Sequence, residues 1–375
     1  MKLVITQANL VLRGGAEKVV LEIAKHYDAK IYTAEYDKNA TFGGFADLDI
    51  DVIGKRTSFW GGSRAGQGLN YGTAFYNYLV KEDYDVINAH VAPSHWIRKR
   101  NERVLWYCHT PLREVYDLYD FRMSLRPSYK RPIYAAGARL VRQIDRRVVK
   151  DIELILANSN NTKGRISKYL HREDAEVLGG GIDYKEWHTG DYGKYFLYPS
   201  RISPNKRQEY AIAAFESFKR RKHGYKLIIA GNVSQDKFYL DYYEKVKKIA
   251  KGVGDVKIVN DPSDDAMRRL YAGALCVLYT PINEDYGLVP LEAGASEKPV
   301  IAVNEGGPKS TVVDGKTGYL VNSTDEMAMR MVDVAEDKKL AEKLGEAGRK
   351  NVIENYSWKV FFERFDRYLS KVKKM

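Results

Sequence analysis

Short runs of valine, isoleucine and leucine alternate with longer stretches of helical periodicity along most of the chain. Residues 3–6, 86–88, 104–107 and 154–157 form such runs. A strand of a parallel sheet is covered by helices on both faces, so it is apolar throughout instead of alternating between polar and apolar residues. The pattern therefore predicts an α/β protein with parallel sheets and helices on both faces of each sheet.

The chain contains 375 residues, which is too long for one hydrophobic core and indicates two domains. A second series of apolar runs begins at 195–198 and continues through 227–231 and 300–303. Three glycines at 179–181 precede this series and are suited to a hinge. We predict a first domain over 1–182, a linker over 183–194 and a second domain over 195–357.

The formal net charge of +12 indicates an anionic partner, such as a nucleotide diphosphate, an anionic lipid surface or a nucleic acid. Zinc-finger and RNA-recognition motifs are absent from the sequence, which disfavours nucleic acid. Cys108 and Cys276 lie in separate apolar runs and show neither a disulfide pattern nor zinc spacing. No apolar run is long enough to span a bilayer, and residues 1–6 fit a first buried strand better than a signal peptide. We therefore expect a cytoplasmic protein.

The stretch 283–295 places Glu284 and Glu292 eight positions apart. Gly287 allows a sharp turn between them, and Pro290 suits the first turn of a helix because no backbone donor is lost there. Free amides at a helix start attract phosphate or hydroxyl oxygens. The amides in question belong to Gly287, Leu288 and Val289. The stretch therefore predicts a site for a sugar and a phosphate.

Residues 284–293 resemble the Glu-x7-Glu signature of the retaining glycosyltransferases of family four, which have the GT-B architecture of two Rossmann-like domains facing across a cleft. Tyr286 before the glycine is similar to the mannosyltransferase-type version. The resemblance implies that Glu284 lies beside the donor sugar and that Glu292 binds the ribose hydroxyls. It also implies that residues 286–289 contact the sugar and the diphosphate.

Other segments extend the resemblance over nearly the whole chain. Gly14 and Gly15 lie at a strand-to-helix turn, which relatives place against the donor diphosphate. The segment 109–113 resembles a His-x-Pro-x-Arg stretch, which implies that His109 approaches the donor sugar. The end of the chain, 358–375, resembles the helix that crosses back onto the first domain. The resemblance thus makes the first domain the acceptor side and the second domain the nucleotide-sugar side.

In the second domain, Arg201 and Lys206 resemble the pair that clamps the donor diphosphate in family members. An arginine fork and a lysine point charge suit the binding of one anion. Gly231 and Asn232 form a turn that faces the nucleotide in relatives. The loop 305–310 departs from the family, because Ser310 stands where a glutamate is usual, and its role is left open.

Residues 47–51 contain an Asp-x-Asp pattern, which some glycosyltransferases use to hold a divalent metal. Here the aspartates alternate with Leu48 and Ile50, as on one solvated face of a strand. We interpret them as structural. Because GT-B enzymes generally work without a metal, we predict no metal site and no cofactor other than the donor substrate.

Two segments combine basic residues with aromatic or helical patterns. Lys55, Arg56, Phe59 and Trp60 precede an amphipathic stretch at 69–80, which suits either a helix packed on the sheet or a membrane-facing acceptor surface. A predicted helix carries several basic residues at spacings of three or four, which form a solvated face or a docking surface for a phosphate-bearing acceptor or an anionic membrane. These residues are Arg139, Arg142, Arg146, Arg147 and Lys150.

The predicted activity is retaining transfer of a sugar, with mannose favoured, from a nucleotide diphosphate sugar to a hydroxyl of a glycan or lipid-linked acceptor. Polysaccharide biosynthesis is a fitting context, and GDP-mannose is the favoured donor. Three alternatives stay open: a UDP-glucose-type donor, a GT-B nucleotide-sugar 2-epimerase, and a non-catalytic anion-binding protein. The spacing of Glu284 and Glu292 and the pair of Arg201 and Lys206 argue against the epimerase.

Overall fold

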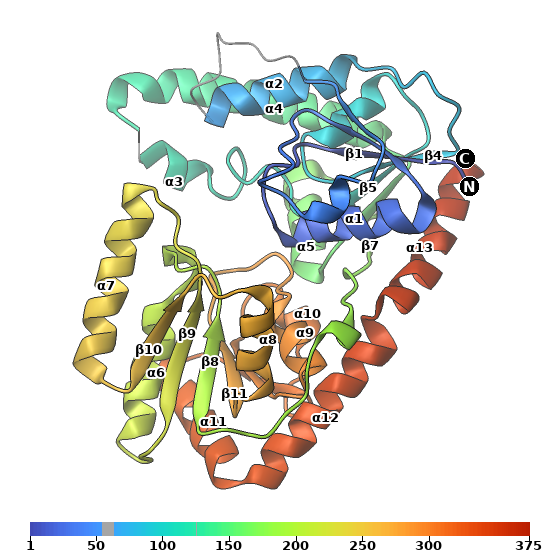
Figure 1. Ribbon diagram of the computed structural model, residues 1–375. Coiled ribbons are helices and arrows are strands. Elements are labelled where there is room, and N and C mark those ends of the chain that lie inside the picture. Colours follow the sequence, from blue (N-terminus) through green and yellow to red (C-terminus); the bar gives the residue numbers. More distant parts are fainter. Residues whose placement is uncertain (55–63, 125) are drawn as a thin grey trace. The chain divides into compact units, whose positions relative to one another are not determined.

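The computed structural model describes residues 1–54, 64–124 and 126–375 (Figure 1). The chain forms two compact units. The first unit contains Met1–Gly180 and Phe362–Met375, and the second contains Gly181–Phe361. The linker predicted at 183–194 lies in the second unit, and its role as a linker stays a prediction.

A parallel sheet organises the first unit, with its described strands in the order β3-β2-β1-β4-β5-β6-β7. The strands are β1 (Leu3–Gln7), β2 (Lys30–Thr33), β3 (Ile50–Val52), β4 (Val86–Ala89), β5 (Val104–Cys108), β6 (Leu154–Ala157) and β7 (Glu176–Val177). All four apolar runs predicted as strands in this unit lie in strands of this sheet. In β1, β4, β5 and β6 every residue is buried, as expected for strands covered on both faces.

The helices of the first unit connect the strands of this sheet. They are α1 (Gly15–Tyr27), α2 (Arg64–Asn77), α3 (Tyr119–Ser124), α4 (Arg131–Asp151) and α5 (Asn160–Leu170), with 3-10 turns η1 (Gly43–Phe45), η2 (Ser94–Lys99) and η3 (Ser128–Lys130). Ser159 is the N-cap of α5, since its side chain accepts a hydrogen bond from the Thr162 amide at 3.1 Å. Residues 55–60, part of the predicted membrane-facing segment, lie outside the described residues.

The C-terminal helix α13 (Trp358–Lys373) contributes its later turns to the first unit. Phe362 stacks on His26 of α1 with ring centroids 3.8 Å apart. The Tyr27 hydroxyl donates a hydrogen bond to Asp366 at 2.8 Å. Lys371 pairs with Glu176 at 3.2 Å, so this end of the chain is held to the first unit by both apolar and polar contacts.

A second parallel sheet organises the second unit, with its described strands in the order β10-β9-β8-β11-β12-β13. The strands are β8 (Tyr195–Pro199), β9 (Lys226–Gly231), β10 (Val256–Asn260), β11 (Cys276–Tyr279), β12 (Val300–Val303) and β13 (Gly318–Val321). The helices are α6 (Gln208–Lys219), α7 (Lys237–Val253), α8 (Asp264–Ala272), α9 (Val289–Ala295), α10 (Pro308–Thr311), α11 (Thr324–Glu336) and α12 (Lys338–Asn355), with 3-10 turns η4 (Tyr184–Glu186) and η5 (Pro204–Lys206).

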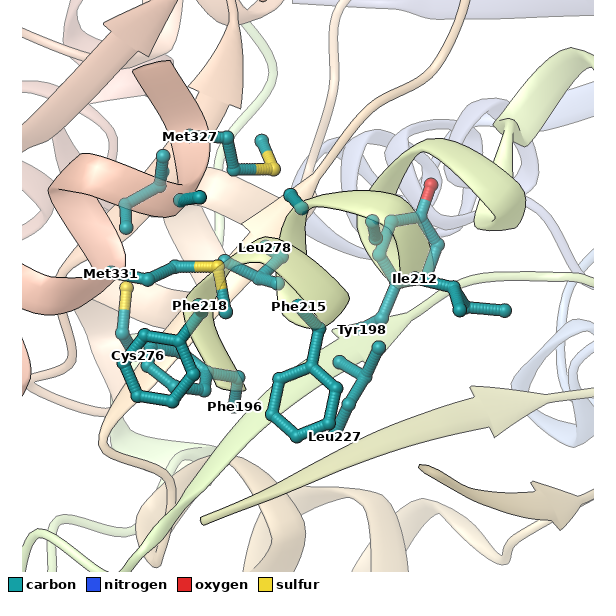
Figure 2. Close-up of a cluster of buried hydrophobic side chains, with 14 of the residues drawn as sticks. Phe196, Tyr198, Ile212, Phe215, Phe218, Leu227, Cys276, Leu278, Met327 and Met331 are labelled. Carbon is teal, nitrogen blue, oxygen red and sulfur yellow. The ribbon is translucent and has the colours of Figure 1, made fainter. Parts of the chain in front are cut away.

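Successive residues of β8 face opposite helical layers, which explains why the strand is apolar throughout. Phe196 and Tyr198 belong to a core that includes Phe215 of α6 and Met331 of α11. Figure 2 shows this cluster between the helices and the strands. Leu197 points to the other core, which contains residues of α8 and α9. The predicted fold class, an α/β protein with two parallel-sheet domains, is therefore confirmed.

Candidate active site

Strands β8 and β11 are neighbours in the second sheet, at the point where the strand order changes direction. In open α/β sheets, ligands bind beyond the carboxyl ends of the strands at such a point. Arg201 and Lys206 follow β8, and Glu284 follows β11. The structure thus brings three predicted site residues from two distant sequence regions to the same end of one sheet.

Lys206 and Glu284 form an ion pair between Nζ and Oε2. Their side chains are 13% and 23% exposed, so the pair is shielded but still accessible. Lys206 Nζ also lies 5.7 Å from the centroid of the Tyr279 ring. The ammonium group can attract a phosphate, while the carboxylate holds the ammonium in place and can stabilise developing positive charge.

The backbone that carries Lys206 is tied to the end of β11. The Thr280 hydroxyl donates a hydrogen bond to the Lys206 carbonyl at 3.1 Å. Arg207 donates from Nε to the Thr280 carbonyl at 2.7 Å and from Nη2 to Glu305 at 3.0 Å. The position of Lys206 is therefore set by the fold as well as by its ion pair.

Glu292 lies in the first turn of α9, as predicted from the position of Pro290. The Tyr271 hydroxyl, from α8, donates a hydrogen bond to Glu292 Oε2 at 2.5 Å. Burial raises the pKa of Glu292 above its ordinary value, while the bond from Tyr271 and the charge of Lys206 act in the opposite direction. The carboxylate is thus held in one orientation and keeps lone pairs that can accept hydrogen bonds from ligand hydroxyls.

Gly231 lies against the backbone that leads to Arg201. A Cβ atom at Gly231 would lie 2.0 Å from the Ser200 carbonyl oxygen, so only glycine fits there. The Ile202 amide donates a hydrogen bond to the Asn232 carbonyl at 2.9 Å. The backbone around Arg201 is therefore fixed, while the Arg201 side chain is exposed.

The loop 305–307 packs directly on the backbone of the Glu284 loop. A Cβ atom at Gly306 would lie 2.5 Å from the Glu284 carbonyl oxygen, and the Gly307 amide donates a hydrogen bond to that oxygen at 2.7 Å. Gly287 has a φ of +81°, which a glycine adopts without strain. The loop whose role the sequence left open supports Glu284, whereas the Ser310 side chain has no assigned role. The Tyr286 side chain is buried against Leu291, and Leu288 and Val289 are partly buried.

In the first unit, Gly14 is the N-cap of α1 and Gly15 is its first residue, as the sequence predicted. A Cβ atom at Gly14 would lie 2.6 Å from Oε2 of Glu17. Glu17 is buried and its Oε1 accepts a hydrogen bond from Gln7 at 3.2 Å. Burial raises the pKa of Glu17 to about 7. The turn at Gly14 therefore packs against the carboxyl group of Glu17, which is largely protonated in slightly acidic solution.

His109 follows β5 at the carboxyl end of the first sheet. Its carbonyl accepts a hydrogen bond from Asn158 at 3.0 Å, and its Nε2 lies 3.1 Å from Nδ1 of His90. Nε2 of His90 in turn lies 2.7 Å from Oδ1 of Asn88. Burial lowers the pKa of His109 to about 3 and the pKa of His90 well below its ordinary value. Both rings are therefore neutral at physiological pH.

Two sequence interpretations concern residues outside this constellation. Cys108, for which the sequence showed neither a disulfide pattern nor zinc spacing, is buried. Burial raises the pKa of its thiol well above the ordinary value, which disfavours a nucleophilic role. Asp51 pairs with Lys30 at 2.9 Å, and Asp49 lies 3.8 Å from the same lysine. These ion pairs agree with a structural role for the Asp-x-Asp pattern.

Several residues that hold the predicted site residues in place were not predicted from the sequence. Asn88 and His90 could have been found from the sequence, because a polar residue within an apolar strand and a second one two positions later, directly after the strand, can point to the same side. Tyr271 and Arg207 left no such signal, because each meets its partner only through packing of distant segments.

Two protein-family models match the chain in succession. Residues 13–186 match the family described as Glycosyltransferase Family 4, and residues 185–351 match the family described as Glycosyl transferases group 1. Together the matches include every predicted site residue. The chain is a glycosyltransferase of family four. The predicted GT-B architecture and the predicted hexosyltransferase class of enzyme are thereby confirmed.

Known proteins resemble this glycosyltransferase over nearly its full length. The alpha-1,3/1,6-mannosyltransferase ALG2 of Mus musculus is 28% identical to it, over 96% of this chain and 94% of the relative. Two solved structures share the fold at 18% identity. The Anabaena protein HepE, in complex with UDP and glucose, has a TM-score of 0.75 and covers 99% of both chains. Sucrose-phosphate synthase of Thermosynechococcus elongatus has a TM-score of 0.77, also over 99% of both chains.

The described part of the glycosyltransferase offers neither a metal-ion cluster nor a membrane-spanning helix. Within residues 1–54, 64–124 and 126–375, no group of three His, Cys, Asp or Glu side chains is arranged to hold a metal ion. In the same described part of the chain, every helix is too short or too polar to cross a bilayer.

Proposed function

We propose that this glycosyltransferase transfers mannose from GDP-mannose to a hydroxyl of a glycan or lipid-linked acceptor, with retention of the anomeric configuration. The pair of Lys206 and Glu284 carries this proposal, because a cation and a carboxylate side by side could stabilise a leaving diphosphate and a developing positive sugar. The mannosyltransferase relatives, which match over almost the whole chain, support mannose as the transferred sugar.

Each predicted residue has a role in this reaction. Arg201 and Lys206 stabilise the negative charge that grows on the diphosphate as the glycosidic bond breaks, and Glu284 stabilises the anomeric carbon. Glu292 accepts hydrogen bonds from the ribose, and His109 contacts the donor sugar. The remaining contacts with the donor come from Gly14, Gly15, Gly231, Asn232, Tyr286, Gly287, Leu288 and Val289.

Retention follows from attack of the acceptor on the same face that the diphosphate leaves, assisted by the leaving phosphate. We assign Glu284, which forms an ion pair with Lys206, an electrostatic role in which it forms no covalent bond to the sugar. Mass spectrometry of the enzyme after reaction with a slow fluorinated donor tests this mechanism. A glycosyl adduct on Glu284 would contradict it. We also propose that no metal takes part, which predicts full activity in excess chelator.

Thermal stabilisation by nucleotides tests the donor directly. A ligand at about a hundredfold above its dissociation constant adds about 2.7 kcal/mol to the free energy of unfolding. We expect GDP and GDP-mannose to raise the melting temperature, and UDP and ADP compounds to have little effect. A shift with UDP compounds alone would replace the donor but keep the site, and UDP-glucose would then be the first candidate. No shift with any of them would contradict the proposed site.

We further propose that the enzyme is cytoplasmic and binds the surface of an anionic membrane through α4. Ile133, Ala136, Gly137 and Leu140 form an exposed apolar stripe along this helix, and Ile133 is 75% exposed. Residues 126–150 contain eight arginines and lysines and one acid, Asp145, which is buried. An exposed apolar stripe flanked by cations fits the interface of anionic lipids.

Vesicle flotation tests this membrane contact. We expect the enzyme to float with vesicles that contain phosphatidylserine and to stay unbound with phosphatidylcholine alone. Replacing both Ile133 and Leu140 by Asp removes the apolar stripe and should abolish flotation. Phe238→Asp is the matched control, since Phe238 is 56% exposed on α7 of the second unit. Equal loss in the control variant, or equal binding to both vesicles, would contradict the proposal.

A further inference from the structure

The hydrogen bonds around Asn88 fix the orientation of its amide. Nδ2 of Asn88 lies 3.2 Å from the carbonyl oxygen of Leu105, which can only accept. The amide NH₂ group therefore faces Leu105, and Oδ1 faces Nε2 of His90 at 2.7 Å. Because Oδ1 can only accept, Nε2 of His90 must carry a hydrogen and donate it.

The position of the hydrogen on His90 also determines the position of the hydrogen on His109. A neutral imidazole has one N–H, so Nδ1 of His90 has a lone pair and accepts. Its neighbour at 3.1 Å, Nε2 of His109, must then donate. Both rings are neutral because burial lowers the pKa of each. His109 is consequently left with a lone pair on Nδ1.

The backbone of His90 is itself held in place, so the chain of hydrogen bonds is rigid. The Trp106 indole donates to the His90 carbonyl at 2.8 Å, and the His90 amide donates to Thr6 at 2.9 Å. Asn88 and His90 are both fully buried. Two buried polar side chains, one in β4 and one directly after it, are costly unless they are paired. Here both are paired only when each hydrogen bond is donated in the direction from His109 to His90 to Asn88.

We propose that Asn88 and His90 are positioning residues that hold His109 as its Nε2–H tautomer, so that Nδ1 accepts a hydrogen bond from a hydroxyl of the donor sugar. The role toward the sugar rests on the proposed function, whereas the tautomer does not. A sugar hydroxyl bound in this way must be a hydrogen-bond donor. A donor analogue in which fluorine replaces that hydroxyl cannot make the bond and should lose about tenfold in kcat/KM.

Nitrogen NMR of the full-length protein, labelled with ¹⁵N-histidine, tests the tautomer without any substrate. The His109 signals are assigned by their loss in His109→Phe. We expect the wild-type protein to show hydrogen on Nε2 and a bare Nδ1 from about pH 5 to about pH 9. Asn88→Leu removes the acceptor of the His90 hydrogen, so both tautomers of His109 should appear. Hydrogen on Nδ1 of His109 in the wild type would overturn the proposal.

Kinetics test the positioning role. His90→Phe removes the acceptor for His109 and should lower kcat about tenfold, while KM for the donor changes less. His90→Asn places an amide oxygen near the position of Nδ1 and should restore most of the loss. Asn101→Leu is the control for stability, because Asn101 is also buried and bonded but precedes β5 at its opposite end.

The results separate the two proposals. A loss of kcat in Asn101→Leu as large as in His90→Phe would overturn the positioning role. The predicted tautomer in a protein that transfers no sugar from any nucleotide would support the hydrogen-bond chain and contradict the proposed function instead.

Discussion

The carboxyl ends of the two sheets carry different kinds of chemistry. The second sheet ends in charged groups, with Lys206 paired to Glu284 and Arg207 paired to Glu305. The first sheet ends in neutral groups, and His90 and His109 are kept uncharged by burial. The difference follows exposure: a charged pair is tolerated where solvent still reaches it, whereas buried groups neutralise and rely on directed hydrogen bonds.

The carboxyl ends of the two sheets suit different parts of the donor. Fixed charges suit a diphosphate, whose negative charge increases as the donor is cleaved. Fixed neutral donors and acceptors suit the hydroxyls of a sugar, which are recognised by the geometry of their hydrogen bonds and not by charge. Substitutions at the charged end should therefore affect kcat most, and those at the neutral end should act through orientation and pH.

The largest effect is expected at Lys206. Lys206→Met removes a charge-assisted bond worth about 1.5 to 3 kcal/mol and leaves Glu284 without its cation, so kcat should fall about a hundredfold. Steady-state kinetics measure the change. Lys222→Met is the control, because it breaks a surface ion pair with Glu336 away from the site and should leave kcat unchanged. A decrease in kcat of less than about threefold in Lys206→Met would mean that the pair of Lys206 and Glu284 does not take part in the reaction.

Arg201 should have a similar but smaller effect. Its side chain is exposed, whereas Lys206 is held by an ion pair, so Arg201→Ala should lower kcat on the order of tenfold to a hundredfold. Arg220→Ala removes an equally exposed arginine at the end of α6 and should have no effect. Unchanged turnover in Arg201→Ala would contradict the assignment of this residue to the diphosphate.

Tyr271 should change binding more than chemistry. Tyr271→Phe removes the hydrogen bond that orients Glu292 and keeps the buried ring. The lost bond orients Glu292 and is not itself made to the donor, so donor binding should weaken by about threefold to tenfold. The change should appear in KM for the donor because the ribose takes no part in bond breaking. An equal loss in kcat with KM unchanged would mean that Glu292 acts in the reaction itself.

Glu17 should have the smallest effect on activity and should instead change how stability depends on pH. Its pKa is raised from 4.5 to about 7 in the folded state, so the native protein holds this proton more tightly than the unfolded chain. The stability that this group contributes is full below the unfolded value and is lost as the pH rises toward about 7. Glu17→Gln stays neutral, so thermal denaturation should show the variant to be more stable than the wild type at about pH 8 and equal to it at about pH 4. The same difference in stability between variant and wild type at both pH values would mean that the pKa of Glu17 is not raised in the folded protein.

Most of the fold could be predicted from the sequence. Runs such as 154–157 became strands with the predicted bounds, and Pro290 marked the start of α9. These features are local, because apolar periodicity and proline geometry act within a few residues. The positions of Lys206 and Glu284 at one end of the sheet followed from parallel topology.

The sequence by itself determined the two parallel sheets and which segments end at the site, because continuous apolar runs and glycine turns specify strands and their ends locally. Only the tertiary structure decided which residues pair with one another. Tyr271 bonds to Glu292, Arg207 pairs with Glu305, and His90 bonds to His109. A hydrogen bond between distant residues depends on distances of a few tenths of an ångström and on burial, and neither is written in the spacing of residues along the chain.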